Sequence, residues 1–140
     1  MATRANNNYK YSVHGENSLL KAAGRERNRA DCGADETDHV VELQLVVAAL
    51  NTLPSTTYTT EGWQTQLVDF FNKDLNLQCM KRETNREKGR AVRTFIRGGW
   101  LAEQERTRIT AIKNHWIGIK HQLYNFVEFK AALDGILARV

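Results

Sequence analysis

The chain has 140 residues, of which 41% are hydrophobic and 26% charged, a balance typical of one soluble domain. No apolar run approaches the roughly 20 residues that a transmembrane helix needs. Two cysteines are too few for a disulfide-rich scaffold, and a single proline excludes a proline-rich or collagen-like chain. We therefore expect a single domain over residues 1–140, with residues 1–14 as an irregular lead-in that lacks the apolar core of a secretory signal.

The net charge of +4 is unevenly distributed along the chain. Residues 1–30 carry a net charge of +4, residues 31–78 of −7 and residues 79–140 of +7. An acidic segment between basic flanks suits a cation site bordered by a phosphate-binding surface, although chance variation along a solvated surface would give the same pattern. Cys32 and Cys79 could form a disulfide or remain free thiols, and free thiols are the simpler default.

Capping residues and apolar spacing predict three helices in the first half of the chain. The second of them, beginning at Thr37 or Asp38, contains valines that would also suit the start of a strand. The expected helices are residues 17–29, 37–50 and 61–72, separated by polar loops at residues 30–37 and 51–60.

The second half of the chain predicts one short strand and three helices. The strand should cover residues 75–80. Thr84 and Glu87 stand at capping-box spacing, so a helix is expected to begin there and to end at Gly98-Gly99. Two further helices should occupy residues 101–140, with a break near Gly118. The predicted fold is mainly α with a small β element.

The residues that could carry chemistry are Asp38-His39, Asn76-Leu77, Asn85 and Lys88. Adjacent Asp and His offer an anionic oxygen for a hard cation beside an imidazole that can take a proton near neutral pH. Asn85 lies at the start of the predicted helix and should face its apolar side, where a buried amide needs a partner such as a metal or its bound water.

Residues 76–88 resemble the second half of an HNH endonuclease motif, in which Asn-Leu is followed by Asn-x-x-Lys, Asn-x-x-Asn or Asn-x-x-His on a helix. Asp38-His39 resembles the Asp-His pair that opens this motif. The resemblance covers about 20 residues at two places and implies an elaborated ββα-metal core. It marks a divergent member, because a long insertion of 36 residues separates His39 from Asn76.

The resemblance also implies a role for each residue. Asp38 and Asn85 would bind a divalent metal, most simply Mg²⁺, with Mn²⁺, Ni²⁺ or Zn²⁺ as alternatives. The metal would neutralise charge on the phosphate, and His39 would activate water as the general base. Asn76 would hold the His39 ring through its other nitrogen. Lys88 stands where many members place a metal-binding His, and it could contact phosphate instead.

Each of these residues also has a purely structural interpretation. His39 would be a core residue if it lies on a helix in line with Leu43 and Leu50. Asp38 could serve only as an acid near a helix N-terminus, where it is favourable to the helix dipole. Asn85 could be only a capping residue, and Glu42 could be an alternative metal ligand or a solvated acid.

Four arginines should form one stripe of the helix that follows the strand, opposite its apolar face. Such a stripe can bind a nucleic-acid backbone, or it can be a solvated face paired with the acidic segment. The expected nucleic-acid contacts are Lys81, Arg82, Arg86, Lys88, Arg90, Arg93 and Arg97.

The function that these patterns favour is a metal-dependent endonuclease acting on DNA or RNA, such as a toxin or effector nuclease. The alternatives are a non-catalytic nucleic-acid-binding module and a helical protein–protein interaction domain. No membrane partner is expected.

Overall fold

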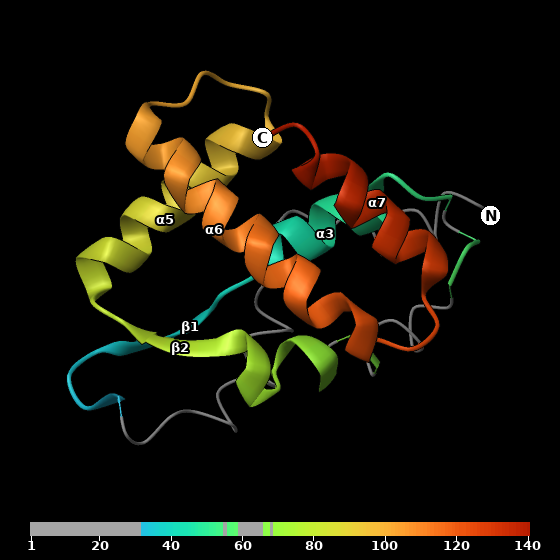
Figure 1. The fold of residues 1–140 in the computed structure, drawn as a ribbon, viewed down its shortest axis with the longest axis horizontal. Coiled ribbons are helices and arrows are strands. Elements are labelled where there is room, and N and C mark those ends of the chain that lie inside the picture. The colour runs from blue at the N-terminus through green and yellow to red at the C-terminus, as the bar shows by residue number, and fades with distance from the viewer. Residues whose placement is uncertain (1–31, 55, 59–65, 68) are drawn as a thin grey trace.

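The computed structural model describes residues 32–54, 56–58, 66–67 and 69–140. The expected helix at residues 17–29, the lead-in at residues 1–14 and half of the expected helix at residues 61–72 lie outside these ranges. The described residues are mainly helical and include a two-stranded antiparallel sheet, which confirms the predicted fold class (Figure 1). No described helix is both long and apolar enough to cross a bilayer.

The sheet consists of β1 (Glu36–His39) and β2 (Leu77–Met80). The strands pair with Glu36 opposite Met80 and His39 opposite Leu77. The predicted strand near residues 75–80 is therefore confirmed, preceded by a 3₁₀ turn at Asp74–Asn76. The prediction that a loop at residues 30–37 leads directly into a helix is wrong, because residues 36–39 form a strand. Pairing with a partner about 40 residues away overrides the weak strand propensity of this polar stretch.

Helix α3 (Leu43–Asn51) lies at the centre of the core. It contacts helix α5 (Arg82–Ile96) and helix α7 (Val127–Leu137). Seven of its nine residues are buried, and a helix covered on most sides needs no polar stripe. The apolar sequence of α3 therefore suits a helix in the core, although its valines would also have suited a strand.

An aromatic cluster fills the core between the helices. The ring of Phe71 stacks on Trp116 with their centroids 6.0 Å apart, and Phe129 meets both rings edge-on. Trp116 belongs to helix α6 (Glu103–Ile119) and Phe129 to α7. The described parts of the expected helix at residues 61–72 support its prediction, since residues 66, 67 and 69–71 are helical and Leu67, Phe70 and Phe71 are buried.

Helix α5 begins at Arg82, two residues before the predicted cap at Thr84. Its N-cap is Lys81, which makes no side-chain capping bond, so the capping-box prediction is wrong. The helix follows β2 with a single intervening residue, and this short connection holds its first two turns against β1. Its end is close to the prediction: Ile96 is the last helical residue, Arg97 is the C-cap, and Gly98 follows with a φ of +76°, a backbone conformation that favours glycine.

The last 40 residues form the two predicted helices, α6 and α7. Gly118 lies inside α6 rather than at the break. The helix ends at a 3₁₀ turn over Lys120–Gln122, and Asn125 and Phe126 then adopt positive φ values of 65° and 54° before α7 begins. The chain therefore reverses about seven residues after the predicted break.

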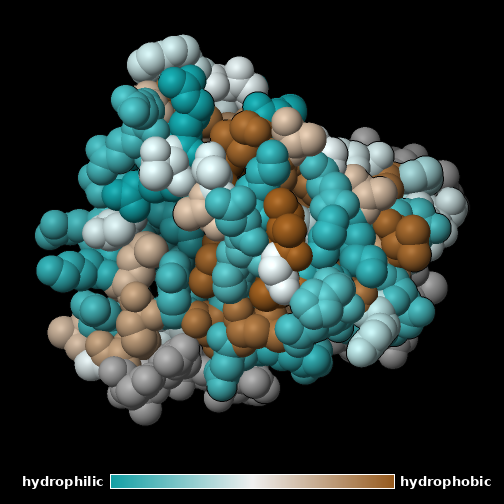
Figure 2. Space-filling model, in the orientation of Figure 1, coloured by the Kyte–Doolittle hydropathy of each residue, from teal (hydrophilic) through white to brown (hydrophobic). Residues whose placement is uncertain are grey.

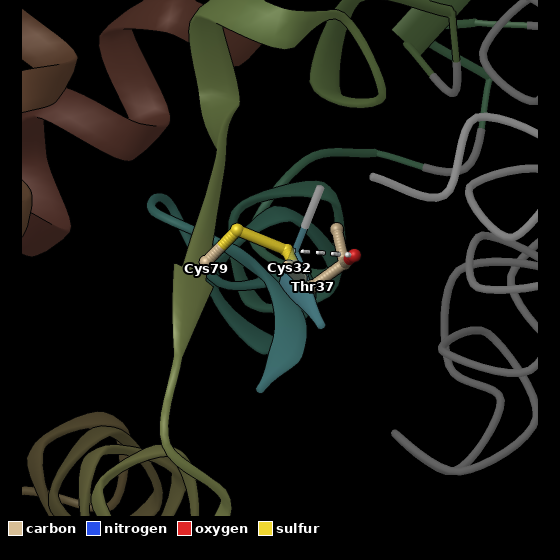
Figure 3. The surroundings of a disulfide bond; sticks show 3 residues. All are labelled: Cys32, Thr37 and Cys79. Carbon is tan, nitrogen blue, oxygen red and sulfur yellow. Dashed lines mark hydrogen bonds between the residues drawn. A yellow bond between two sulfur atoms is a disulfide. The ribbon is translucent and has the colours of Figure 1, made fainter. Parts of the chain in front are cut away.

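Cys32 and Cys79 form a disulfide bond (Figure 3), so free thiols are the wrong default. The bridge joins the turn before β1 to β2, across 47 positions of sequence. Within the sheet, Cys79 is paired with Thr37, whose hydroxyl oxygen lies 3.6 Å from Cys32 Sγ. The disulfide therefore adds a covalent link between β1 and β2, whose backbone pairing spans only four residues per strand.

Reduction of this disulfide should destabilise the fold. In the chain-entropy model, a cross-link that closes a loop of this length lowers the conformational entropy of the unfolded chain. It thereby adds about 3–4 kcal/mol to the free energy of unfolding. We expect the Cys32→Ser/Cys79→Ser variant to lose about that much free energy of unfolding in urea denaturation. Dithiothreitol should lower the wild-type midpoint similarly and leave that of the variant unchanged. An equal midpoint for reduced and oxidised wild type would contradict the bond.

Candidate functional site

Strand β1 presents its two acidic side chains to helix α5. Successive residues of a strand point to opposite faces, so Glu36 and Asp38 share one face. Glu36 Oε1 accepts a hydrogen bond from Asn85 Nδ2 at 3.0 Å, and Asp38 Oδ2 accepts one from Lys88 Nζ at 2.6 Å. The spacing of two residues on the strand thus matches one turn of the helix.

The ammonium group of Lys88 is buried among oxygen atoms, and Lys88 is only 4% exposed. Besides Asp38 Oδ2, it donates to the backbone carbonyl of His39 at 2.7 Å. A carboxylate oxygen of Glu42, the N-cap residue of α3, lies 4.0 Å away. Lys88 therefore connects α5 to the end of β1 and to the start of α3, and it does not lie on the exposed surface with the arginines of α5.

The side chain of His39 lies on the face of β1 opposite Glu36 and Asp38, and a hydrogen bond holds its ring there. Its Nε2 lies 2.6 Å from Oδ1 of Asn72, and Asn72 is buried, with 1% exposure. Since an amide oxygen can only accept, Nε2 carries the proton, and in the neutral ring the lone pair is then on Nδ1. His39 is half-buried on a strand, so the interpretation of a core histidine on a helix does not apply.

Asn76 joins the two strand ends instead of contacting His39. Its Oδ1 accepts from the Val41 amide at 2.9 Å, and its Nδ2 donates to the carbonyls of Val41 and Phe71 at 3.3 and 3.0 Å. Its own backbone carbonyl accepts from Val40 N at 2.8 Å. The side chain is fully buried, and these bonds use its amide oxygen and both amide hydrogens. The expected bond from Asn76 to the ring is not made, and Asn72 takes that role.

Sequence reasoning missed Asn72 because no motif includes it. The residue follows Phe70 and Phe71 at the end of the expected amphipathic helix. A polar residue directly after two buried aromatic ones is a weak signal for a buried hydrogen-bonding group. It could have been noticed only as an amide that needed a partner.

The structure brings Asp38 and Asn85 to the same face of β1, where a metal was expected, and gives each a protein partner. Asp38 Oδ2 accepts from Lys88 and also from Gln78 Nε2 at 2.9 Å. Asn85 uses its amide nitrogen on Glu36. A cation needs oxygen lone pairs, whereas a bound ammonium both occupies them and repels a second cation. As they lie, these residues do not fit a divalent metal shared between Asp38 and Asn85.

The arginines of α5 lie on its outer face, as the sequence predicts, while Ala91, Val92 and Phe95 are buried. In Figure 2 the flank of the molecule where α5 lies is largely hydrophilic. Two acids, Glu83 and Glu87, share this exposed surface. The exposed basic residues here are Lys81, Arg82, Arg86, Arg90, Arg93 and Arg97.

Comparison of the chain with models of protein families, with curated proteins and with solved structures finds no match. The function is therefore inferred from the geometry of the site and from the sequence.

The buried Asp38–Lys88 pair should be costly to break from either side. Removing one partner of a buried ion pair leaves an uncompensated charge and typically costs about 3–5 kcal/mol. We expect Asp38→Asn and Lys88→Met each to lose about that much free energy of unfolding. The double variant should lose clearly less than the sum of the two.

The control for this cycle is Lys120→Met. Lys120 Nζ lies 3.0 Å from Asp134 Oδ2, but both side chains are more than a third exposed, so its loss should cost about 1 kcal/mol or less. Additive losses in the Asp38 and Lys88 cycle would mean that the two groups do not interact as the structure has them.

Proposed function

We propose that this chain is an endonuclease of the HNH kind that hydrolyses phosphodiester bonds in nucleic acid, with His39 as the general base. One observation supports this above all others. Strand β1 pairs with the consecutive β2 and α5, about 40 residues later in the chain, to form a β-β-α unit with Asp38-His39 at the end of the first strand. The residues of the HNH-like motif thereby meet in one place, despite the 36 residues between His39 and Asn76.

In the proposed reaction, the His39 ring takes a proton from a water molecule while the water oxygen forms a bond to phosphorus. The bond from phosphorus to the leaving oxygen then breaks, that oxygen takes up a proton from solvent water, and the imidazolium returns its proton to solvent. A positioned base of this kind contributes roughly 10²–10⁴-fold to a rate. Because an amide is uncharged, Asn72 orients the ring without placing an anion beside it.

The exposed basic residues of α5 would bind the substrate backbone. Phosphate contacts by Lys and Arg position a protein on nucleic acid without reading its sequence. Arg90 and Arg93 lie in the middle of this surface and face outward.

Replacing His39 should abolish most of the cleavage. We expect His39→Ala to cut supercoiled plasmid and structured RNA roughly 10²–10⁴ times more slowly than wild type, because the base is lost. Initial rates in gel assays, with circular dichroism to confirm the fold, measure this effect.

The matched control is His121→Ala, which removes an exposed histidine in the turn after α6 and should cut at the wild-type rate. Equal rates for His39→Ala and wild type would exclude His39 as the base. Wild type that cuts neither polymer, with or without added divalent metals, would contradict the nuclease proposal and leave a binding module or a protein–protein interaction domain.

Reversing charge on α5 should weaken nucleic-acid binding. We expect Arg90→Glu/Arg93→Glu to lower affinity for duplex DNA by about tenfold or more. The salt dependence of the log binding constant should become shallower by about 2, since about one counterion is released per phosphate contact. Fluorescence anisotropy over a series of salt concentrations measures both quantities.

The control variant Lys73→Glu/Arg106→Glu makes the same change in net charge on other exposed surfaces. It should retain a nearly wild-type salt slope. If both double variants change affinity and slope equally, the effect is one of net charge and α5 is not the binding surface.

A further inference from the structure

We propose that the ammonium group of Lys88 occupies the cation position of this site, so that the chain cleaves its substrate without a bound divalent metal. The inference rests on the proposed function and differs from the Mg²⁺ expectation of the sequence. In this arrangement Lys88 is a positioning residue, because it acts through Asp38 and through the backbone of His39.

The surroundings of Lys88 Nζ are those that a hard cation would take. Its neighbours are a carboxylate oxygen of Asp38 at 2.6 Å, the carbonyl oxygen of His39 at 2.7 Å and a carboxylate oxygen of Glu42 at 4.0 Å. Carboxylate and backbone carbonyl oxygens are also the ligands of Mg²⁺ and Ca²⁺. The side chain is 5% exposed, so this contact is part of the protein interior.

One of the two carboxylate oxygens of Asp38 is already saturated. Asp38 Oδ2 accepts from both Lys88 Nζ and Gln78 Nε2, and a carboxylate oxygen has about two lone-pair sites. A divalent ion bound to this oxygen would also lie within a few ångströms of the ammonium and be repelled by it. A metal at Oδ2 would have to displace Lys88 and break its two short hydrogen bonds.

The ammonium also does for the fold what a metal bridge would do. It joins α5 to the end of β1, and its bond to the His39 carbonyl fixes the backbone from which the ring projects. Asn72 then fixes the ring from the opposite face. His39 is thus held at its backbone, where its carbonyl accepts from the Lys88 ammonium, and at its ring, where Nε2 donates to the amide oxygen of Asn72.

The decisive experiment uses wild-type protein in two assays. In the first, plasmid and RNA cleavage are measured after exhaustive treatment with EDTA and again with 5 mM Mg²⁺ or Mn²⁺. In the second, Mn²⁺ is titrated into ¹⁵N-labelled protein, and paramagnetic broadening of the amide signals near Asp38 and His39 is followed.

We expect cleavage in EDTA at a rate within about threefold of that with metal, and no saturable broadening near Asp38 below millimolar Mn²⁺. Cleavage only with metal would overturn the inference while leaving the proposed function intact. Saturable broadening centred on Asp38 would overturn it as well. If no cleavage occurs under any condition, the proposed function fails. The Mn²⁺ titration still decides what fills the cation position, because saturable broadening near Asp38 would show a metal there and its absence would leave the position to the Lys88 ammonium.

Variants of Lys88 add a signal that a merely structural role would not produce. Lys88→Met leaves the carboxylates of Asp38 and Glu42 facing a site without its cation. We expect Mn²⁺ to bind there and to raise the melting temperature of this variant by several degrees, with no such shift in wild type. A folded Lys88→Met that ignores Mn²⁺ would count against the inference, and if the variant does not fold, the two wild-type assays decide.

Discussion

The candidate site depends on one buried charge. Lys88 is almost fully enclosed, and an ammonium in such a place persists only when it is paired and hydrogen-bonded. Asp38 supplies the counter-charge, and the carbonyl of His39 supplies a second acceptor. The requirement to satisfy this group fixes the distance between α5 and β1, and with it the position of the histidine that we propose as the base.

Two further connections hold the short sheet together. Four residues per strand give little backbone pairing, and an isolated two-stranded sheet is marginally stable in water. Asn76 binds the backbone on either side of the strand ends, and the disulfide between Cys32 and Cys79 closes the other end. The strands are thus fixed at both ends by side-chain chemistry, which allows a long segment to intervene between them.

Local patterns predicted the parts of the fold that local forces determine. The faces of α5, its end at Gly98, the short strand near Leu77 and the two C-terminal helices all follow from periodicity and turn chemistry. Strand β1 was missed because its partner is about 40 residues away. The sequence draws attention to Asp38, His39, Asn76 and Asn85 through their resemblance to a motif, but their hydrogen-bond partners were not predictable. The counter-charge of Lys88 lies 50 positions before it and could not be found locally. Helical spacing does place Lys88 in line with Ala91, Val92 and Phe95 on the buried face of α5, a signal that the prediction of Lys88 as a phosphate contact did not use.

The segment between the two halves of the motif also belongs to the site. Its first part forms α3, whose N-cap residue Glu42 faces the Lys88 ammonium. Its last part carries Asn72, which holds the His39 ring. Asn72 can do so because Phe71, next to it, is anchored in the aromatic cluster with Trp116 and Phe129. The packing of the C-terminal helices is therefore coupled to the orientation of the proposed base, and a compact motif without this segment would lack that support.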